Sequence, residues 1–187
     1  MKTKILIVLL IVFCSCSSNK KIDFGEFEIE VPKKWNRYNK TGTDSYVGAL
    51  ITNHNDTLEF DLGRYSQDLI KSDFPMVYDS FRLAELTKKE LQLLPKTKHL
   101  IEDTLPTDIN YNVYLQYQFE KVSIDCFQGK LIEPRNNDFG GAGIYIDSIK
   151  GSDKNHNKIS FNFYGWYLKS KTKRKFFKAL KTINFKD

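Results

Sequence analysis

The sequence predicts an α+β fold in which an antiparallel β-sheet of about six strands is covered by a C-terminal helix. Several short segments alternate apolar and polar residues with a period of two, which is typical of strands with one buried face. The chain carries 10 Tyr and 14 Phe, and this aromatic content favours strands over a helical bundle. Residues 169–182 instead space their apolar side chains as a helix does.

The N-terminus has the composition of a secretory signal peptide. Lys2 and Lys4 precede an unbroken apolar run from Ile5 to Phe13, which gives the basic and hydrophobic regions of such a signal. The run is too short to cross a bilayer, because a spanning helix needs about 20 apolar residues. We therefore expect export without a transmembrane anchor.

The sequence Phe13-Cys14-Ser15-Cys16 stands where a signal peptide would be cleaved. It resembles the lipobox of bacterial lipoproteins, in which a small residue precedes a cysteine that is lipidated and becomes the new N-terminus. The resemblance fits Cys16 best, with Ser15 as the small residue. Phe13 and Cys14 depart from the usual Leu and Ser or Ala, so Cys14 stays the alternative site. The resemblance implies a signal peptide over 1–15, palmitate on Cys16, and a membrane-anchored envelope protein that faces the periplasm or the exterior.

The remaining chain is expected to form one domain behind a short tether. Residues 16–22 comprise the lipidated cysteine and a polar segment without periodicity, which predicts a flexible tether whose basic end reaches anionic headgroups. Residues 23–187 are long enough for a single globular α+β domain. Loss of Lys2 and Lys4 lowers the formal charge from +6 to +4, which is too mild to indicate a nucleic-acid partner.

The first strands have the clearest patterns. Residues 24–31 place Phe27, Ile29 and Val31 on one face and three glutamates on the other, and Pro32 ends the segment. Trp35 is expected to fold back onto the core. Residues 45–52 and 57–62 predict two strands joined as a hairpin by the polar residues 53–56.

Later strands are predicted over residues 76–80, 111–119, 121–127, 144–149 and 158–164. Thr87 and Glu90 have the spacing of a capping box, which indicates a short helix or turn. Residues 136–143 read as a loop, in which Gly140 to Gly143 supply backbone freedom. Cys126 lies in an alternating run and is expected to be a small buried residue.

The segment 169–182 is the best-defined helix. Ser170 is the predicted N-cap, and an apolar stripe follows at Phe176, Phe177, Leu180 and Ile183. Lysine and arginine cover the other faces. This charge is typical of a solvated helix surface, and it also suits an acidic partner or lipid phosphates.

Two motifs resemble PsbP/Mog1-like domains. Phe27-Glu28-Ile29-Glu30-Val31-Pro32-Lys33-Lys34-Trp35 is similar to their opening strand and P-x-x-W turn, and the strand, helix and Thr182-Ile183-Asn184-Phe185 ending is also similar. The middle of the chain departs from the pattern. The resemblance covers about a third of the chain and implies a fold rather than an activity.

No sequence motif indicates a cofactor or a metal. The three histidines, His54, His99 and His156, lack the spacing of a zinc site with each other or with cysteine. The phosphate-loop interpretation of Gly140 to Gly143 fails because a strand pattern follows, where a helix would be required.

We expect a non-enzymatic module that binds a protein or ligand of the envelope. Its predicted contact residues are aromatic and basic: Tyr117, Tyr164, Trp166, Tyr167, Lys171, Arg174 and Lys175. The alternative is a small envelope hydrolase. Glu59 and Asp61 share one face of the 57–62 strand and would act as acid and base, with His54 nearby.

Overall fold

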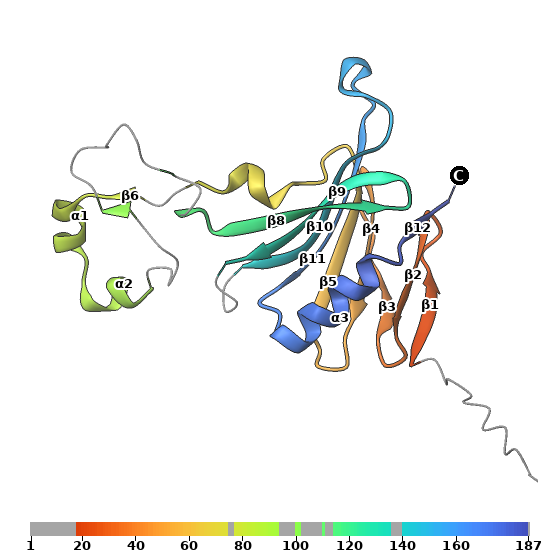
Figure 1. Cartoon of the computed structure of the whole chain (residues 1–187), viewed down its shortest axis with the longest axis horizontal. Helices are drawn as coiled ribbons and strands as arrows, with labels where there is room; N and C mark the ends of the chain where they lie inside the picture. The colour runs from red at the N-terminus through yellow and green to blue at the C-terminus, as the bar shows by residue number, and fades with distance from the viewer. Residues whose placement is uncertain are drawn as a thin grey trace, which may run out of the picture.

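The computed structural model describes residues 18–74, 77–93, 100–101, 110, 114–135 and 140–186. Its largest element is a seven-stranded sheet in which every pair of neighbours is antiparallel (Figure 1). In spatial order the strands are β3 (Asn36–Asn39), β4 (Ser45–Ile51), β5 (Thr57–Gly63), β11 (Ile159–Trp166), β10 (Gly141–Lys150), β9 (Phe127–Pro134) and β8 (Tyr117–Ile124). The mixed α+β class is confirmed, whereas the expected strand number of about six is too low.

The structure also contains a second, three-stranded sheet, which was not predicted. It has the order β1 (Asn19–Asp23), β2 (Phe27–Pro32) and β12 (Asn184–Phe185), so both ends of the described chain pair with β2. The sequence places β2 correctly, with Phe27, Ile29 and Val31 buried. It misses β12 because a two-residue strand has no detectable period.

Strand β1 corrects the expected tether over residues 16–22, because Asn19 to Asp23 pair with β2 residue by residue. Backbone pairing needs no alternation of side chains, so the polar sequence concealed this strand. The basic residues of this segment are also engaged by the fold. Lys21 forms a 2.7 Å ion pair with Glu28, and Lys20 donates to Asn36 at 3.1 Å.

The core lies where the two sheets meet, and Phe27 is at its centre. Phe27 is fully buried, and its ring centroid lies 4.9–6.3 Å from those of Phe24, Phe60, Phe161, Phe163 and Phe185. These rings come from both sheets. The abundant phenylalanine side chains, which favoured a prediction of strands, therefore also pack one sheet against the other.

Helix α3 (Ser170–Leu180) joins the same core. Phe176 lies with its ring centroid 5.2 Å from that of Phe163, and Leu180 and Ile183 are also buried. The observed N-cap is Lys169, one residue before the predicted cap, and it makes no side-chain hydrogen bond; Ser170 is instead the first residue of the helix.

Two expectations about the strands are wrong. Gly141 to Gly143 belong to β10, and a Cβ at Gly143 would collide with the Phe163 carbonyl oxygen, so close strand approach explains this glycine. Cys126 is exposed. Asp125 and Cys126 have φ angles of 45° and 70° and form the tight turn between β8 and β9, which takes Cys126 out of the alternation. Residues 136–139 of the predicted loop lie outside the described residues.

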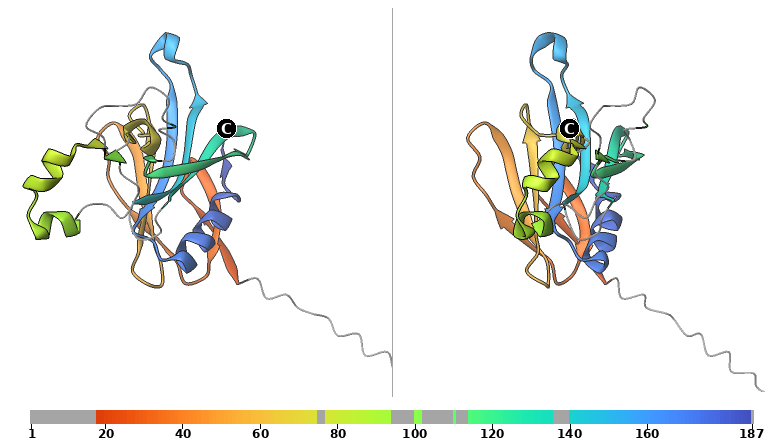
Figure 2. Two further views of the ribbon diagram at one scale, coloured as in Figure 1. Left: turned by 60° about the vertical axis from the view of Figure 1, so that its left-hand side comes forward. Right: turned by 90° about the vertical axis from the view of Figure 1, so that its left-hand side faces the viewer.

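The chain between β5 and β8 adds small elements beside the sheets. These are η1 (Leu69–Ser72), β6 (Val77–Tyr78), α1 (Ser80–Glu85), α2 (Lys88–Leu93) and β7 (Leu100–Ile101). Helices α1 and α2 stand to one side of the main sheet (Figure 2). The Thr87–Glu90 capping box is confirmed, because each residue accepts a hydrogen bond from the backbone of the other. A further short helix, η3 (Asp153–Asn155), lies in the projecting β10–β11 connection (Figure 1).

The Phe27 cluster generates a stability prediction. Phe27→Ala is expected to lower the free energy of unfolding by about 3–5 kcal/mol. It leaves a cavity that the surrounding rings, held by both sheets, cannot move in to fill. Phe81→Ala is the matched control. Phe81 is 73% exposed, so its loss is expected to change that free energy by less than about 0.5 kcal/mol. Urea unfolding followed by circular dichroism measures both, and equal effects would contradict this placement of the core.

Candidate functional site

The seven-stranded sheet separates the predicted contact residues into two groups. Phe161 and Phe163 face α3 and the three-stranded sheet, so by strand alternation Asn162 and Tyr164 face the opposite side. Tyr117 and Tyr145 pack there with Tyr164, and we call this the tyrosine face. The structure therefore brings Tyr117 and Tyr164 together but does not bring them to the basic residues of α3.

Tyr117 and Tyr164 are buried, with 8% and 7% of their surface exposed. The segment 64–74, which we call the strap, crosses the tyrosine face. The Gln67 carbonyl accepts hydrogen bonds from the Tyr164 hydroxyl and the Asn162 amide, both at 3.2 Å. The Asp73 carboxylate accepts the backbone N–H groups of Gln116 and Tyr117, at 2.9 and 2.8 Å.

An ion pair between a buried carboxylate and a partly exposed lysine fixes the middle of the strap. The fully buried Asp68 carboxylate accepts from Lys130 Nζ at 2.7 Å and caps η1 by accepting from the Ile70 N–H at 3.0 Å. The Lys130 ammonium also lies 5.7 and 5.8 Å from the ring centroids of Phe119 and Tyr145. Sequence reasoning missed this pair because its members are 62 residues apart. Only Asp68 before the apolar Leu69-Ile70 carried a local signal, that of a helix cap.

Trp166 and Tyr167 form an exposed aromatic patch at the end of β11. They are 50% and 65% exposed, with ring centroids 6.4 Å apart. The patch is held in place by the sheet. The Tyr167 N–H donates to the Gly140 carbonyl at 3.0 Å, and the Gly141 N–H donates to the Tyr117 hydroxyl at 3.2 Å. Large aromatic side chains on a fixed support are typical of binding surfaces.

The predicted basic residues Lys171, Arg174 and Lys175 are all exposed on α3. Arg174 borders a groove between the helix and strands β8 and β9, together with Phe177 and Glu133. Lys175 borders a different groove on the other side of the helix. The three residues therefore do not form one site.

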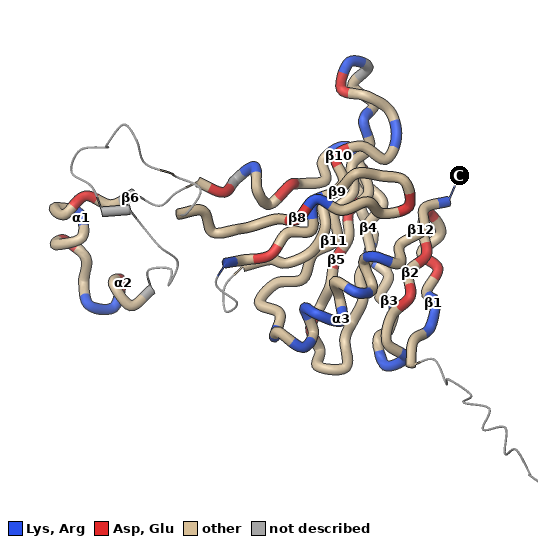
Figure 3. Tube along the Cα trace, viewed as in Figure 1, with Lys and Arg blue, Asp and Glu red and all other residues tan. Residues whose placement is uncertain are grey.

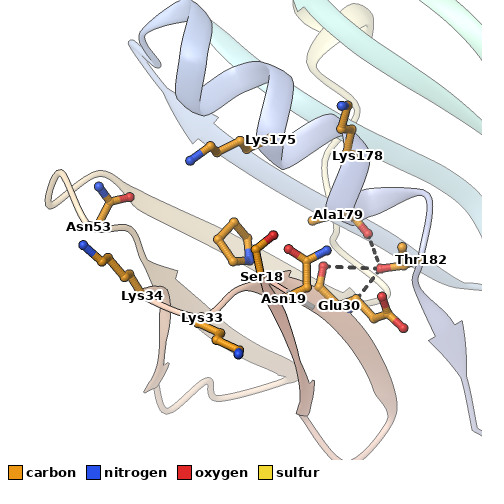
Figure 4. A pocket seen from close by; sticks show the side chains of 11 residues that line it. Ser18, Asn19, Glu30, Lys33, Lys34, Asn53, Lys175, Lys178, Ala179 and Thr182 are labelled. Atoms are coloured by element: carbon orange, nitrogen blue, oxygen red, sulfur yellow. Dashed lines mark hydrogen bonds between the residues drawn. The ribbon is translucent and has the colours of Figure 1, made fainter. Parts of the chain in front are cut away.

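We call the second of these hollows the basic groove. It has a volume of about 650 Å³, and its rim carries Lys33, Lys34, Lys175 and Lys178 against one acidic residue, Glu30. Lys33 and Lys34 follow β2, while Lys175 and Lys178 extend from α3. In Figure 4 the Lys175 side chain points to the side of the groove where Asn53 and Lys34 lie, and Lys178 points away from Ser18 and Asn19. The lysines come from two segments that are about 140 residues apart in the sequence. No local sequence motif could therefore have predicted that they share one groove.

Hydrogen bonds fix the walls of the basic groove. Thr182 Oγ accepts from the Glu30 N–H at 2.9 Å and donates to the Ala179 carbonyl at 2.6 Å, which ties the end of α3 to β2 (Figure 4). At the β4–β5 loop, which carries Asn53 of the groove lining, the Thr172 hydroxyl donates to Asp56 at 3.1 Å. This bond holds the loop against α3. The groove is therefore a fixed feature of the fold.

The carboxylates of the alternative hydrolase have other partners. Glu59 forms a 2.5 Å ion pair with Lys40, and Asp61 accepts from Ser66 Oγ at 3.1 Å. His54 lies in the hairpin loop, where its ring nitrogen is 3.1 Å from the Asn53 amide nitrogen. Within the described ranges, no hydrogen bond joins Glu59, Asp61 and His54 to one another.

Three or more His, Cys, Asp or Glu side chains do not gather as a potential metal site anywhere in the described part of the chain. Nor does that part contain a helix with the length and apolar content needed to span a membrane. The predicted lipidation site, Cys16, and the alternative, Cys14, lie outside the described residues.

No protein-family model matches this sequence. A search of curated proteins likewise finds no match. Function is therefore inferred from the residues and their geometry.

The tyrosine face generates a prediction for alkaline pH. Burial raises the pKa of Tyr117, Tyr145 and Tyr164 in the folded state. Their unfolded pKa is about 10, so their contribution to stability is full below pH ~10 and is lost as the pH rises towards the folded values. We expect these phenols to stay protonated after pH passes ~10 and to ionise on unfolding.

Tyrosinate absorbance followed together with circular dichroism measures this effect. Tyr164→Phe should remove one late-titrating group and lower the free energy of unfolding by about 1 kcal/mol, because the Gln67 carbonyl loses a donor. Ionisation of every tyrosine in one step while the fold stays intact would contradict the prediction.

Proposed function

We propose that this chain is a lipoprotein of the bacterial cell envelope, anchored in a membrane by lipid on Cys16 and facing the periplasm or the exterior. The lipobox-like sequence is the main support. The described core is compatible with this processing. Its first member is Ile22, so cleavage before Cys16 would remove none of it.

We further propose that the domain is a non-enzymatic module that binds a protein or ligand of the envelope. The observation that carries this proposal is the aromatic patch. Trp166 and Tyr167 are exposed although pairing of Trp166 with Gly141 and the bond from the Tyr167 N–H to the Gly140 carbonyl fix the backbone beneath them. Preorganised aromatic side chains lose little conformational freedom on binding, so they suit recognition. The carboxylates Glu59 and Asp61 have local partners, and no contact between residues that the structure describes favours the hydrolase.

Within this domain we assign α3 the role of covering one face of the main sheet. The packing of Phe176 against Phe163 and the burial of Leu180 support this role. The opposite face of the main sheet is crossed by the strap instead.

The anchor is tested by metabolic labelling with palmitate. The wild-type chain should take up label and fractionate with membranes, because two or more acyl chains give stable attachment. Cys16→Ser should abolish both results. Cys14→Ser is the matched control and should leave them unchanged. Loss of label in Cys14→Ser alone would move the anchor to Cys14, and an unlabelled wild type would refute the proposal.

The binding module is tested by comparing variants in a pull-down from solubilised membranes. A partner of the aromatic patch should be retained at least about tenfold less by Trp166→Ala/Tyr167→Ala, since central aromatic residues dominate binding energy. The control is Tyr38→Ala/Phe81→Ala, which removes aromatic residues of similar exposure elsewhere. If every co-purifying protein survives the patch variant, the patch is not the binding surface.

A further inference from the structure

We propose that the basic groove binds the phosphate headgroups of anionic lipids in the membrane that holds the anchor, which turns α3 towards the bilayer. This inference rests on the proposed lipid anchor at Cys16 and deepens it. It assigns the groove a lipid ligand and gives the anchored domain one orientation.

The first step is distance. Ser18 lines the groove, and its carbonyl oxygen accepts from the Lys33 N–H at 3.0 Å. Only Ser17 separates it from Cys16 in the sequence. An extended chain spans at most about 3.6 Å per residue, so Ser18 lies within about 7 Å of the lipidated cysteine. Attraction between charges in physiological salt extends over about 8 Å, so an anchored groove lies within range of the headgroups.

The second step is charge. Lys34, Lys175 and Lys178 form no ion pair with any residue that the structure describes, and all three are exposed. Among the described residues that line the groove, Glu30 is the one acidic side chain, and it faces four lysines. A concave surface with excess positive charge attracts anions, and several lysines beside a bilayer bind anionic lipids.

The third step is the contrast with neighbouring basic residues. Lys20 and Lys21, which are nearer to Cys16 in the sequence, are bound to Asn36 and Glu28. Lys173 on α3 is mostly buried and pairs with Glu133 at 2.9 Å. The positive charge available for a ligand near the N-terminus is therefore concentrated at the groove. The charge-coloured trace shows basic residues along α3 and near the turn between β2 and β3 (Figure 3).

The test uses the mature lipidated protein in two vesicle preparations, pure phosphatidylcholine and phosphatidylcholine mixed with phosphatidylglycerol. An amine-reactive reagent labels exposed lysines, and mass spectrometry gives the rate at each position. Lys34, Lys175 and Lys178 should react at least about threefold more slowly in the phosphatidylglycerol vesicles, because bound headgroups shield them. Lys88, Lys89 and Lys154, which are exposed elsewhere in the fold, should react at equal rates in both.

Two variants keep the same test specific. Lys175→Gln/Lys178→Gln should remove the protection of Lys34, whereas Lys88→Gln/Lys89→Gln should leave it in place. Both pairs are exposed surface changes that preserve the fold. High salt should abolish the protection, because exposed charges are then screened.

The outcomes separate the groove from the anchor. Flotation with phosphatidylcholine vesicles reports the anchor alone, and its failure would refute the proposed lipoprotein. Normal flotation with equal lysine rates in both vesicles would overturn the groove proposal only. Equal protection by inorganic phosphate in phosphatidylcholine vesicles would overturn the lipid assignment in favour of a soluble phosphate.

Discussion

The structure depends on the packing of Phe27 between the two sheets. Its ring packs against Phe161 of the seven-stranded sheet and also against Phe24 and Phe185. Strand β2 carries this ring, and β2 also pairs with both β1 and β12. The aromatic cluster therefore fixes β1 and β12, the first and last strands of the described residues, relative to the main sheet. The position of the basic groove follows, since β1, β2 and α3 form its walls.

Because the Phe27 cluster fixes β1, the short distance in sequence between Cys16 and β1 limits how the domain can be oriented by an anchor at Cys16. A lipid anchor on a long flexible tether restricts distance from the membrane but not orientation. Here β1 pairs from Asn19 onwards and Ser18 is bonded to Lys33, so little chain remains to rotate. An anchor at Cys16 would then bring one end of the domain, with its lysines, to the surface of the bilayer.

Sequence reasoning succeeded where one buried face imposes a period. Strand β2, the β4–β5 hairpin and α3 were predicted because their apolar residues repeat along the segment. It failed where backbone geometry decides. Strand β1 is held by pairing with β2, and Cys126 is turned outwards by positive φ angles. The groove and the Asp68–Lys130 pair join distant segments, and only the three-dimensional fold brings them together.

The main sheet also decides how the two proposed surfaces relate. Successive residues of a strand point to opposite faces, so Phe163 packs towards α3 while Tyr164 packs beneath the strap. Trp166 continues the tyrosine side, and the lysines of the groove lie on the helix side. A domain held to lipid by its basic groove would therefore keep Trp166 and Tyr167 across the sheet from that contact. Membrane attachment and partner binding, as proposed, would then use different faces, and neither would need to displace the other.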